Sequence, residues 1–152
     1  MAYVKSPPPD RKRKTMPVVK ASDIAFARLQ APDLDVAEQF LVDFGLRRVE
    51  RTASALYMRA TDPDPFAYVA HLGEPRFLSS AWQVESEDDL KAAAKLPGAS
   101  AIESLDEPGG GRRVRLVDPI GYTVELVHGR RPAAGLPVEP VALNFGWDGL
   151  RR

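Results

Sequence analysis

Few side chains in this 152-residue chain are suited to catalysis or to metal binding. There is no cysteine, and the only histidines are His71 and His128. The absence of cysteine excludes a disulfide scaffold, a cysteine nucleophile and thiolate ligands. Two histidines are too few for a three-histidine metal centre within one chain. Acid–base chemistry could come from these two histidines, although strand-end histidines are more often structural, or from carboxylates, of which Glu125 lies in an alternating, strand-like segment.

Two further motifs could contact phosphate groups, but each has a simpler interpretation. Residues 11–14 (RKRK) follow three prolines and have no aromatic neighbours, which is typical of a solvated basic tail. Residues 109–111 (GGG) precede a strand-like segment, whereas a phosphate-binding loop would lead into a helix. The glycines are therefore interpreted as a turn between two strands.

The overall composition limits the partners that this chain can have. Basic and acidic residues number 21 each, so no broad electric field would attract nucleic acid or an anionic membrane. A hydrophobic content of 44% is ordinary for a globular domain, and no apolar run approaches the ~20 residues of a membrane span. The N-terminus lacks the apolar core of a signal peptide, so we expect a cytoplasmic location.

Two segments of the chain repeat one pattern. Residues 59–73 (RATDPDPFAYVAHLG) align with residues 115–129 (RLVDPIGYTVELVHG), matching arginine, Asp-Pro and final glycine positions. Each segment reads as a strand end, a tight turn at Asp-Pro and an alternating strand. The predicted strands place alternate residues on one face: Phe66, Tyr68 and Ala70 in the first, and Tyr122, Val124 and Leu126 in the second.

A strand and a helix are predicted ahead of each repeated segment. The first strand spans residues 23–30, and its helix begins near Asp33, with Asp35 and Glu38 forming a capping box or Asp33 acting as the cap. Helical spacing predicts a buried apolar stripe, made of Val36, Ala37, Phe40, Leu41 and Phe44. Gly45 would end this helix.

The second strand spans residues 77–84, and its helix begins at Ser86 with three acidic residues in the first turn, where the helix dipole favours them. Its predicted buried side consists of Leu90, Ala93, Ala94 and Leu96, and Pro97-Gly98 ends it.

Short strands at residues 47–51, 56–59, 101–104 and 112–117 complete the pattern. The predicted fold is therefore α+β, with two tandem βαβββ modules. We place this paired domain at residues 22–129, with modules at about 22–73 and 74–129. Residues 1–21 form a disordered or extended basic, proline-rich tail, and residues 130–152 form an extended, linker-like tail in this prediction.

The repeated unit, closed by DPIGYTVELVHG, resembles the vicinal oxygen chelate superfamily over residues 22–129. This superfamily holds glyoxalase I, bleomycin-resistance proteins and type I extradiol ring-cleaving dioxygenases. Three stretches resemble the N-terminal domain of a catechol or dihydroxybiphenyl dioxygenase: AFARLQAPDLDVAEQFLVDFGL, DPFAYVAHLGEPRFLSSAWQVES and RLVDPIGYTVELVHGRRP. The trailing PVEPVALNF resembles the linker that leads to the second, catalytic domain of those enzymes.

The resemblance implies four metal-ligand positions, on the first and last strands of each module. In this chain they are occupied by Phe26, Val69, Ser79 and Glu125. Only Glu125 is a typical ligand for a divalent ion. Strand alternation places His71 on the face of Val69 and His128 on the face opposite to Glu125. We therefore expect no metal and no cofactor on this chain, and the Fe(II) or Mn(II) of the family is implied only for a missing catalytic domain.

Three functional hypotheses remain open at this stage. The first is the non-catalytic N-terminal domain, or a truncated relative, of an extradiol dioxygenase involved in aromatic degradation, a family whose reaction inserts O2 beside a catechol hydroxyl pair. The second is a metal-independent protein of the bleomycin-resistance type that binds a small aromatic molecule in a groove. The candidate groove residues are Phe26, Tyr57, Trp82, Tyr122 and Glu125, although the aromatic ones equally suit a core. The third is a glyoxalase-type metalloenzyme, which the four ligand positions disfavour.

The chain alone is expected to be inactive, although Glu125 could act as a metal-free general base. Expected partners are a second copy in a homodimer or the missing second domain.

Overall fold

The computed structural model describes residues 17–137. Most of the two predicted tails therefore lies outside the described residues. Within them the chain forms eight strands and two helices in the order of two βαβββ modules. The first module contains β1 (Ala21–Ala31), α1 (Leu34–Asp43), β2 (Arg47–Arg51), β3 (Ala55–Arg59) and β4 (Tyr68–Leu72). The second contains β5 (Arg76–Val84), α2 (Glu87–Ala93), β6 (Glu103–Ser104), β7 (Arg112–Val117) and β8 (Thr123–His128).

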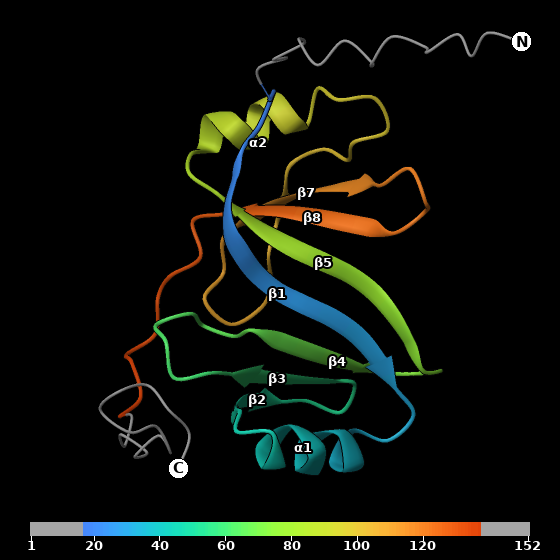
Figure 1. Ribbon diagram of the computed structural model, residues 1–152, viewed down its shortest axis with the longest axis vertical. Helices are drawn as coiled ribbons and strands as arrows, with labels where there is room; N and C mark the ends of the chain where they lie inside the picture. Colours follow the sequence, from blue (N-terminus) through green and yellow to red (C-terminus); the bar gives the residue numbers. More distant parts are fainter. Residues whose placement is uncertain (1–16, 138–152) are drawn as a thin grey trace, which may run out of the picture.

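The two modules join into one sheet with the strand order β2-β3-β4-β1-β5-β8-β7-β6. The order is symmetric about the antiparallel pair β1 and β5, where Ala27 lies opposite Ser80. In each module the first strand also pairs in parallel with the last, β1 with β4 and β5 with β8. The long central strands cross the sheet, with α1 at one end of the molecule and α2 at the other (Figure 1). This architecture confirms the predicted α+β fold of paired βαβββ modules.

Each helix packs its buried side against apolar strand residues of its own module. Leu34 and Leu41 of α1 contact Leu56 and Met58 of β3. Leu90 and Ala93 of α2 belong to an equivalent cluster with strand residues of the second module, confirming Leu90 and Ala93 as buried. A third apolar cluster lies on the sheet face away from the helices: Ala25, Phe26, Ala55, Tyr57, Phe66, Val69, Ala81, Leu105 and Val127.

The predicted buried stripe of α1 is wrong in three positions. Leu34 and Leu41 are buried, whereas Val36, Phe40 and Phe44 are exposed. Both sets of residues have helical spacing, so periodicity alone could not tell which face the sheet would cover. In the structure, the side of α1 that contains Leu34 packs against the sheet.

The helix starts follow capping chemistry, with one correction. Asp33 caps α1 by accepting hydrogen bonds from the N–H groups of Asp35 and Val36, at 2.8 and 3.1 Å. The predicted Asp35–Glu38 capping box is wrong, because Glu38 faces Arg48 instead. The second helix begins as predicted at Ser86, which forms a reciprocal capping box with Asp89.

The predicted turns are also present. Asp62 and Asp118 each accept backbone hydrogen bonds within their Asp-Pro turns. The three-glycine segment lies between β6 and β7, and Gly111 has a φ of 106° and closely approaches the carbonyl of His128. A side chain at this position would be strained and would meet that backbone. Strand β6 is shorter than predicted, beginning at Glu103 rather than at residue 101.

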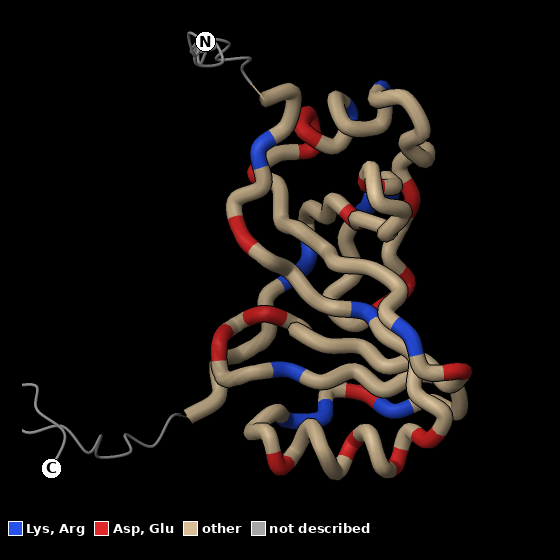
Figure 2. Tube along the Cα trace, turned by 45° about the vertical axis from the view of Figure 1, so that its right-hand side comes forward, with Lys and Arg blue, Asp and Glu red and all other residues tan. Residues whose placement is uncertain are grey.

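Among residues 17–137, basic and acidic side chains are spread over the whole fold (Figure 2). None of the helices between residues 17 and 137 is long and apolar enough to cross a membrane.

Candidate functional site

Phe26, Val69, Ser79 and Glu125, the positions at which the resemblance implies metal ligands and here called the family ligand positions, lie on the sheet face away from the helices. Strand pairing places Val69 and Ser79 directly opposite Arg28, on either side of it. Phe26 and Glu125 both lie opposite Ala81. Residues directly opposite one another in a sheet share a face. The four positions therefore surround Arg28, which the sequence analysis did not single out.

The guanidinium of Arg28 connects three other elements of the structure. Its Nε donates to Oε1 of Glu125 on β8 at 2.9 Å. Its two terminal nitrogens donate to both carboxylate oxygens of Glu107, at 2.7 and 3.0 Å, in a bidentate pair. Nη1 also lies 2.9 Å from Nε2 of His71 on β4. Arg28 thus places a permanent positive charge among the family ligand positions.

Glu125 is buried and held in its ionised form. Its side chain is 2% exposed and accepts hydrogen bonds from Arg28, from the hydroxyl of Ser79, and from Nη1 of Arg113 at 2.9 Å. Burial alone would raise the pKa of Glu125, but the hydrogen bonds and charge of Arg28, helped by Ser79 and Arg113, lower it below the ordinary value. Burial alone would lower the pKa of Arg28, but the carboxylates of Glu107 and Glu125 raise it above the ordinary value.

His71 is a hydrogen-bond acceptor in this arrangement. Because an arginine can only donate, Nε2 of His71 must carry a lone pair toward Arg28. Burial and the neighbouring charge of Arg28 lower the pKa of His71, which keeps the imidazole neutral. His128 lies on the opposite face, with Nδ1 3.0 Å from the carbonyl oxygen of Val84.

These residues do not fit the divalent ion that the resemblance implies. The groups that could act as ligands, Glu125 and His71, both use their donor atoms on Arg28. Phe26 and Val69 have no donor atoms in their side chains. A divalent ion at this place would lie beside a guanidinium, which repels it. Among residues 17–137, no group of three or more histidines and carboxylates is arranged to hold a metal.

A cavity of about 400 Å³ opens beside this network. Its lining residues are Arg28, His71, Leu78, Ser79, Glu107, Arg113, Arg115, Thr123 and Glu125. Glu103 pairs with Arg113 and Arg115 at the rim, at 3.2 and 2.6 Å, and these bonds lower the pKa of Glu103. Three arginines and three glutamates therefore neutralise one another around the cavity.

The five candidate groove residues do not share one groove. Phe26 and Tyr57 are buried against Phe66, with ring centroids 4.7 and 5.2 Å away. Trp82 packs with the α2 cluster, and its Nε1 donates to Ser80. Tyr122 is half-exposed before β8 and makes an edge contact with Phe77. Of the five, only Glu125 lines the cavity.

Phe26 is enclosed by two guanidinium groups. Those of Arg28 and Arg130 each lie 5.1 Å from its ring centroid. Arg130 is itself buried and donates to the carbonyl oxygens of Phe66 and Ala25, at 2.6 and 3.3 Å. Burial lowers the pKa of Arg130. The first of the family ligand positions therefore contains an aromatic ring that contacts two arginine cations.

Sequence reasoning missed Arg28, Glu107, Arg113 and Arg130. Arg28 follows Phe26 by two residues, so strand alternation alone could have placed both on one face. Glu107 lies in the β6–β7 loop and is 79 positions from its partner Arg28, so no local pattern pointed to it.

Comparisons with solved structures found several similar folds. The Mn(II)-bound glyoxalase from Novosphingobium aromaticivorans superposes with a TM-score of 0.72 and 22% identity, over 80% of this chain and 43% of the glyoxalase. An extradiol ring-cleaving dioxygenase from B. fuscum gives 0.68 and 21%, over 81% and 37% of the two chains. Homoprotocatechuate 2,3-dioxygenase from Arthrobacter globiformis gives 0.65 and 25%, over 82% and 42%.

No protein-family model and no curated protein matches the sequence. The chain spans about two fifths of the length of the solved structures that it resembles. Those structures have the same fold as the domain described above. The protein therefore has the vicinal oxygen chelate fold that glyoxalases and extradiol dioxygenases have in common.

Proposed function

We propose that this chain is a non-catalytic module pair of the extradiol dioxygenase type. The observation that carries the proposal is the position of Arg28, whose guanidinium bonds to Glu125 and His71 between the family ligand positions. A fixed organic cation can neutralise the buried carboxylate, but it has no open coordination position for oxygen or a catechol. The positive charge of Arg28 thus balances the buried carboxylate as a metal ion would, but it cannot bind and activate a substrate.

The proposed role is structural support for a catalytic module pair of the same fold. The described domain corresponds to about two fifths of each dioxygenase neighbour, which leaves room in those proteins for a second pair. The network joins β1, β4, β8 and the β6–β7 loop, so it makes the two modules of this pair one rigid unit. A rigid unit of this kind suits a scaffold for a neighbouring active site.

The first experiment measures metal and turnover on the purified chain. The protein is dialysed against Mn(II) or Fe(II) without oxygen, and bound metal is measured by mass spectrometry. Oxygen uptake is then followed with 3,4-dihydroxyphenylacetate, the substrate named for a structural neighbour. The Mn(II)-bound glyoxalase from Novosphingobium is the positive control for metal retention. We expect no stoichiometric metal and no oxygen uptake, and one equivalent of metal with turnover would refute the proposal.

The second experiment tests the supporting role. The DNA following the codon of Arg152, and the neighbouring genes, are read for a βαβββ pair with two histidines and a glutamate at the ligand positions. That pair is expressed with and without this chain, and ring cleavage and thermal stability are compared. We expect both to fall when this chain is omitted. An unchanged activity and melting temperature would argue against a supporting role.

A second candidate function is metal-independent binding of a small molecule. The cavity of about 400 Å³ beside Arg113 and Arg115 favours this alternative, since ligand pockets of small proteins have this size. Isothermal titration with small aromatic acids and with their uncharged analogues would test it. Binding that is lost in the Arg115→Ala variant would favour this function over the scaffold.

A further inference from the structure

One face of α1 is apolar but has no partner among the described residues. Val36, Phe40 and Phe44 are 66, 66 and 76% exposed, although the same helix buries Leu34 and Leu41 against the sheet. Residues four apart lie on one side of a helix, and the rings of Phe40 and Phe44 stack at 6.2 Å. The three side chains form a continuous ridge, here called the α1 ridge. Such surfaces on soluble domains usually mark interaction sites.

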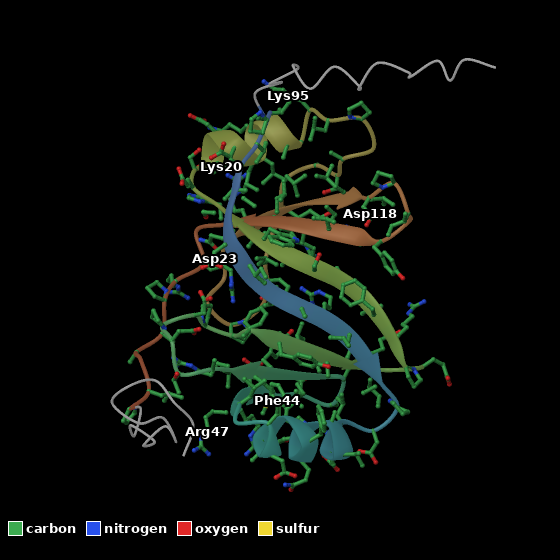
Figure 3. All side chains as sticks on the ribbon, in the orientation of Figure 1. Lys20, Asp23, Phe44, Arg47, Lys95 and Asp118 are labelled. Carbon is green, nitrogen blue, oxygen red and sulfur yellow. The ribbon has the colours of Figure 1, made fainter. Side chains whose placement is uncertain are left out.

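The two ends of the α1 ridge carry opposite charges. Asp33 caps the helix at one end, where its carboxylate is exposed. Arg47 begins β2 beyond the other end of the helix, three positions after Phe44 in the sequence (both residues are labelled in Figure 3). The acidic side chains of α1 have other partners: Glu38 pairs with Arg48, Asp35 pairs with Arg51, and Asp43 accepts a hydrogen bond from Gln39. Within residues 17–137, Arg47 has no ion-pair partner.

We infer that the α1 ridge is a self-association surface that pairs with a second copy of this chain. Two α1 helices lying antiparallel about a twofold axis at Phe40 place Val36 of each copy against Phe44 of the other. The same axis places Asp33 of each copy opposite Arg47 of the other. An isologous contact requires this kind of self-complementarity, because one surface must match itself.

Helix geometry is compatible with this pairing. Both copies contribute the same row of residues four apart, and two such rows pack together when the helix axes cross at about −50°. At this angle Asp33 and Arg47 of opposite copies lie on diverging helix ends, so the contact between them depends on the long side chain of Arg47. The antiparallel arrangement also places the positive N-terminal end of each helix dipole beside the negative end of its partner.

The area of the α1 ridge predicts a weak dimer. Covering two phenylalanines and one valine, each about two-thirds exposed, removes roughly 400 Å² per copy. The total of roughly 800 Å² falls below the ~1,200 Å² of stable interfaces and suits a transient contact. We therefore expect a dissociation constant on the order of 10–100 µM.

Analytical ultracentrifugation of the full chain tests the contact. The average mass of the wild-type protein should rise from 16.7 kDa toward twice that value as its concentration passes through the ~10–100 µM range. Phe40→Glu should weaken association at least about tenfold, because it places two like charges at the axis. Ile120→Glu is the matched control, since Ile120 is 79% exposed on the β7–β8 turn, away from α1.

A charge change separates the α1 ridge from nonspecific hydrophobic association. Arg47→Glu should weaken the dimer about threefold or more at low salt, and less at high salt, because it opposes Asp33 of the other copy. Circular dichroism verifies that each variant remains folded. A wild-type chain that stays monomeric up to about 500 µM overturns the inference. So does a dimer that Phe40→Glu and Ile120→Glu weaken equally.

Cross-linking locates the axis directly. The chain has no cysteine, so Phe40→Cys introduces a single thiol at the proposed twofold position. Oxidation should convert this variant to a disulfide-linked dimer faster than Ile120→Cys at the same concentration. Equal rates for the two variants would contradict an axis at Phe40.

Discussion

At the scale of single residues, Arg28 explains why Glu125 can be buried as a charge. A lone carboxylate at 2% exposure would be protonated or would destabilise the fold. Arg28 and Arg113 supply the positive charge, and Ser79 supplies a further hydrogen bond. Buried ionic networks contribute little net stability when complete but are costly to break. Replacing Arg28 should therefore lower the free energy of unfolding substantially.

Replacing Arg28 by methionine tests this cost. The apolar side chain keeps most of the volume but leaves Glu107 and Glu125 without their main partner. We expect a loss of about 3–5 kcal/mol in the free energy of unfolding, measured by urea denaturation. Arg76→Met, on exposed Arg76 of β5, should cost less than about 0.5 kcal/mol. Equal losses for the two variants would contradict the network.

The lowered pKa of Glu125 predicts a pH dependence of stability. Because the folded state holds fewer protons on Glu125 than the unfolded state, its contribution is complete above the unfolded pKa of ~4.3. The contribution is lost as the pH falls through the lower folded pKa. The stability difference between the wild-type protein and Glu125→Gln should therefore shrink below pH ~4.3.

Urea titrations at several pH values between about 3 and 7 measure this difference. The same substitution at exposed Glu74 is the matched control. A difference that stays constant, or grows, toward low pH would contradict an ionised Glu125.

At the scale of elements, the start of α1 depends on Asp33 rather than on Asp35. Asp33→Ala removes the acceptor for two backbone N–H groups and should cost about 1 kcal/mol of stability. Asp35→Ala removes only an exposed ion pair with Arg51 and should cost less than about 0.5 kcal/mol. Thermal unfolding of the two variants compares these costs. A larger effect at Asp35 would restore the capping box that the sequence suggested.

The elements themselves were largely predictable because local chemistry specifies them. The Asp-Pro turns, the Ser86–Asp89 capping box and the alternating strands depend on residues within a few positions of one another. The orientation of α1 was not predictable in this way. Its two apolar faces both have helical spacing, and only the sheet surface at Leu56 and Met58 selects Leu34 and Leu41.

At the scale of the whole molecule, the segment after β8 ties the two modules together. The N–H of Arg131 donates to Gly109 of the second module, and the N–H of Ala133 donates to Pro63 of the first. The N–H of Leu136 donates to Thr61. Arg130 anchors this segment by placing its guanidinium over the rings of both Phe26 and Phe66, 5.1 and 4.6 Å from their centroids. The segment therefore belongs to the folded structure over residues 130–136.

Replacing Arg130 by alanine should loosen this connection. Two charge-assisted hydrogen bonds and the contacts with both rings are lost, so we expect a destabilisation of about 2 kcal/mol or more. Hydrogen exchange at the amides of Ala133 and Leu136 should also become faster than in the wild-type protein. Arg131→Ala, on the adjacent exposed side chain, is the control and should change neither quantity appreciably. Unchanged exchange in Arg130→Ala would show that the segment is held in another way.

The sequence by itself determined the paired βαβββ architecture, because turn, cap and alternation signals act between near neighbours and occur twice. The resemblance that it carries also implies that Phe26, Val69 and Ser79 stand at three positions where metal ligands are expected. Only the tertiary structure showed that Arg28 occupies the centre of that site, because its partners Glu107 and Glu125 are 79 and 97 positions away. The tertiary structure likewise decided which face of α1 remains exposed, since burial depends on the surface that a helix meets.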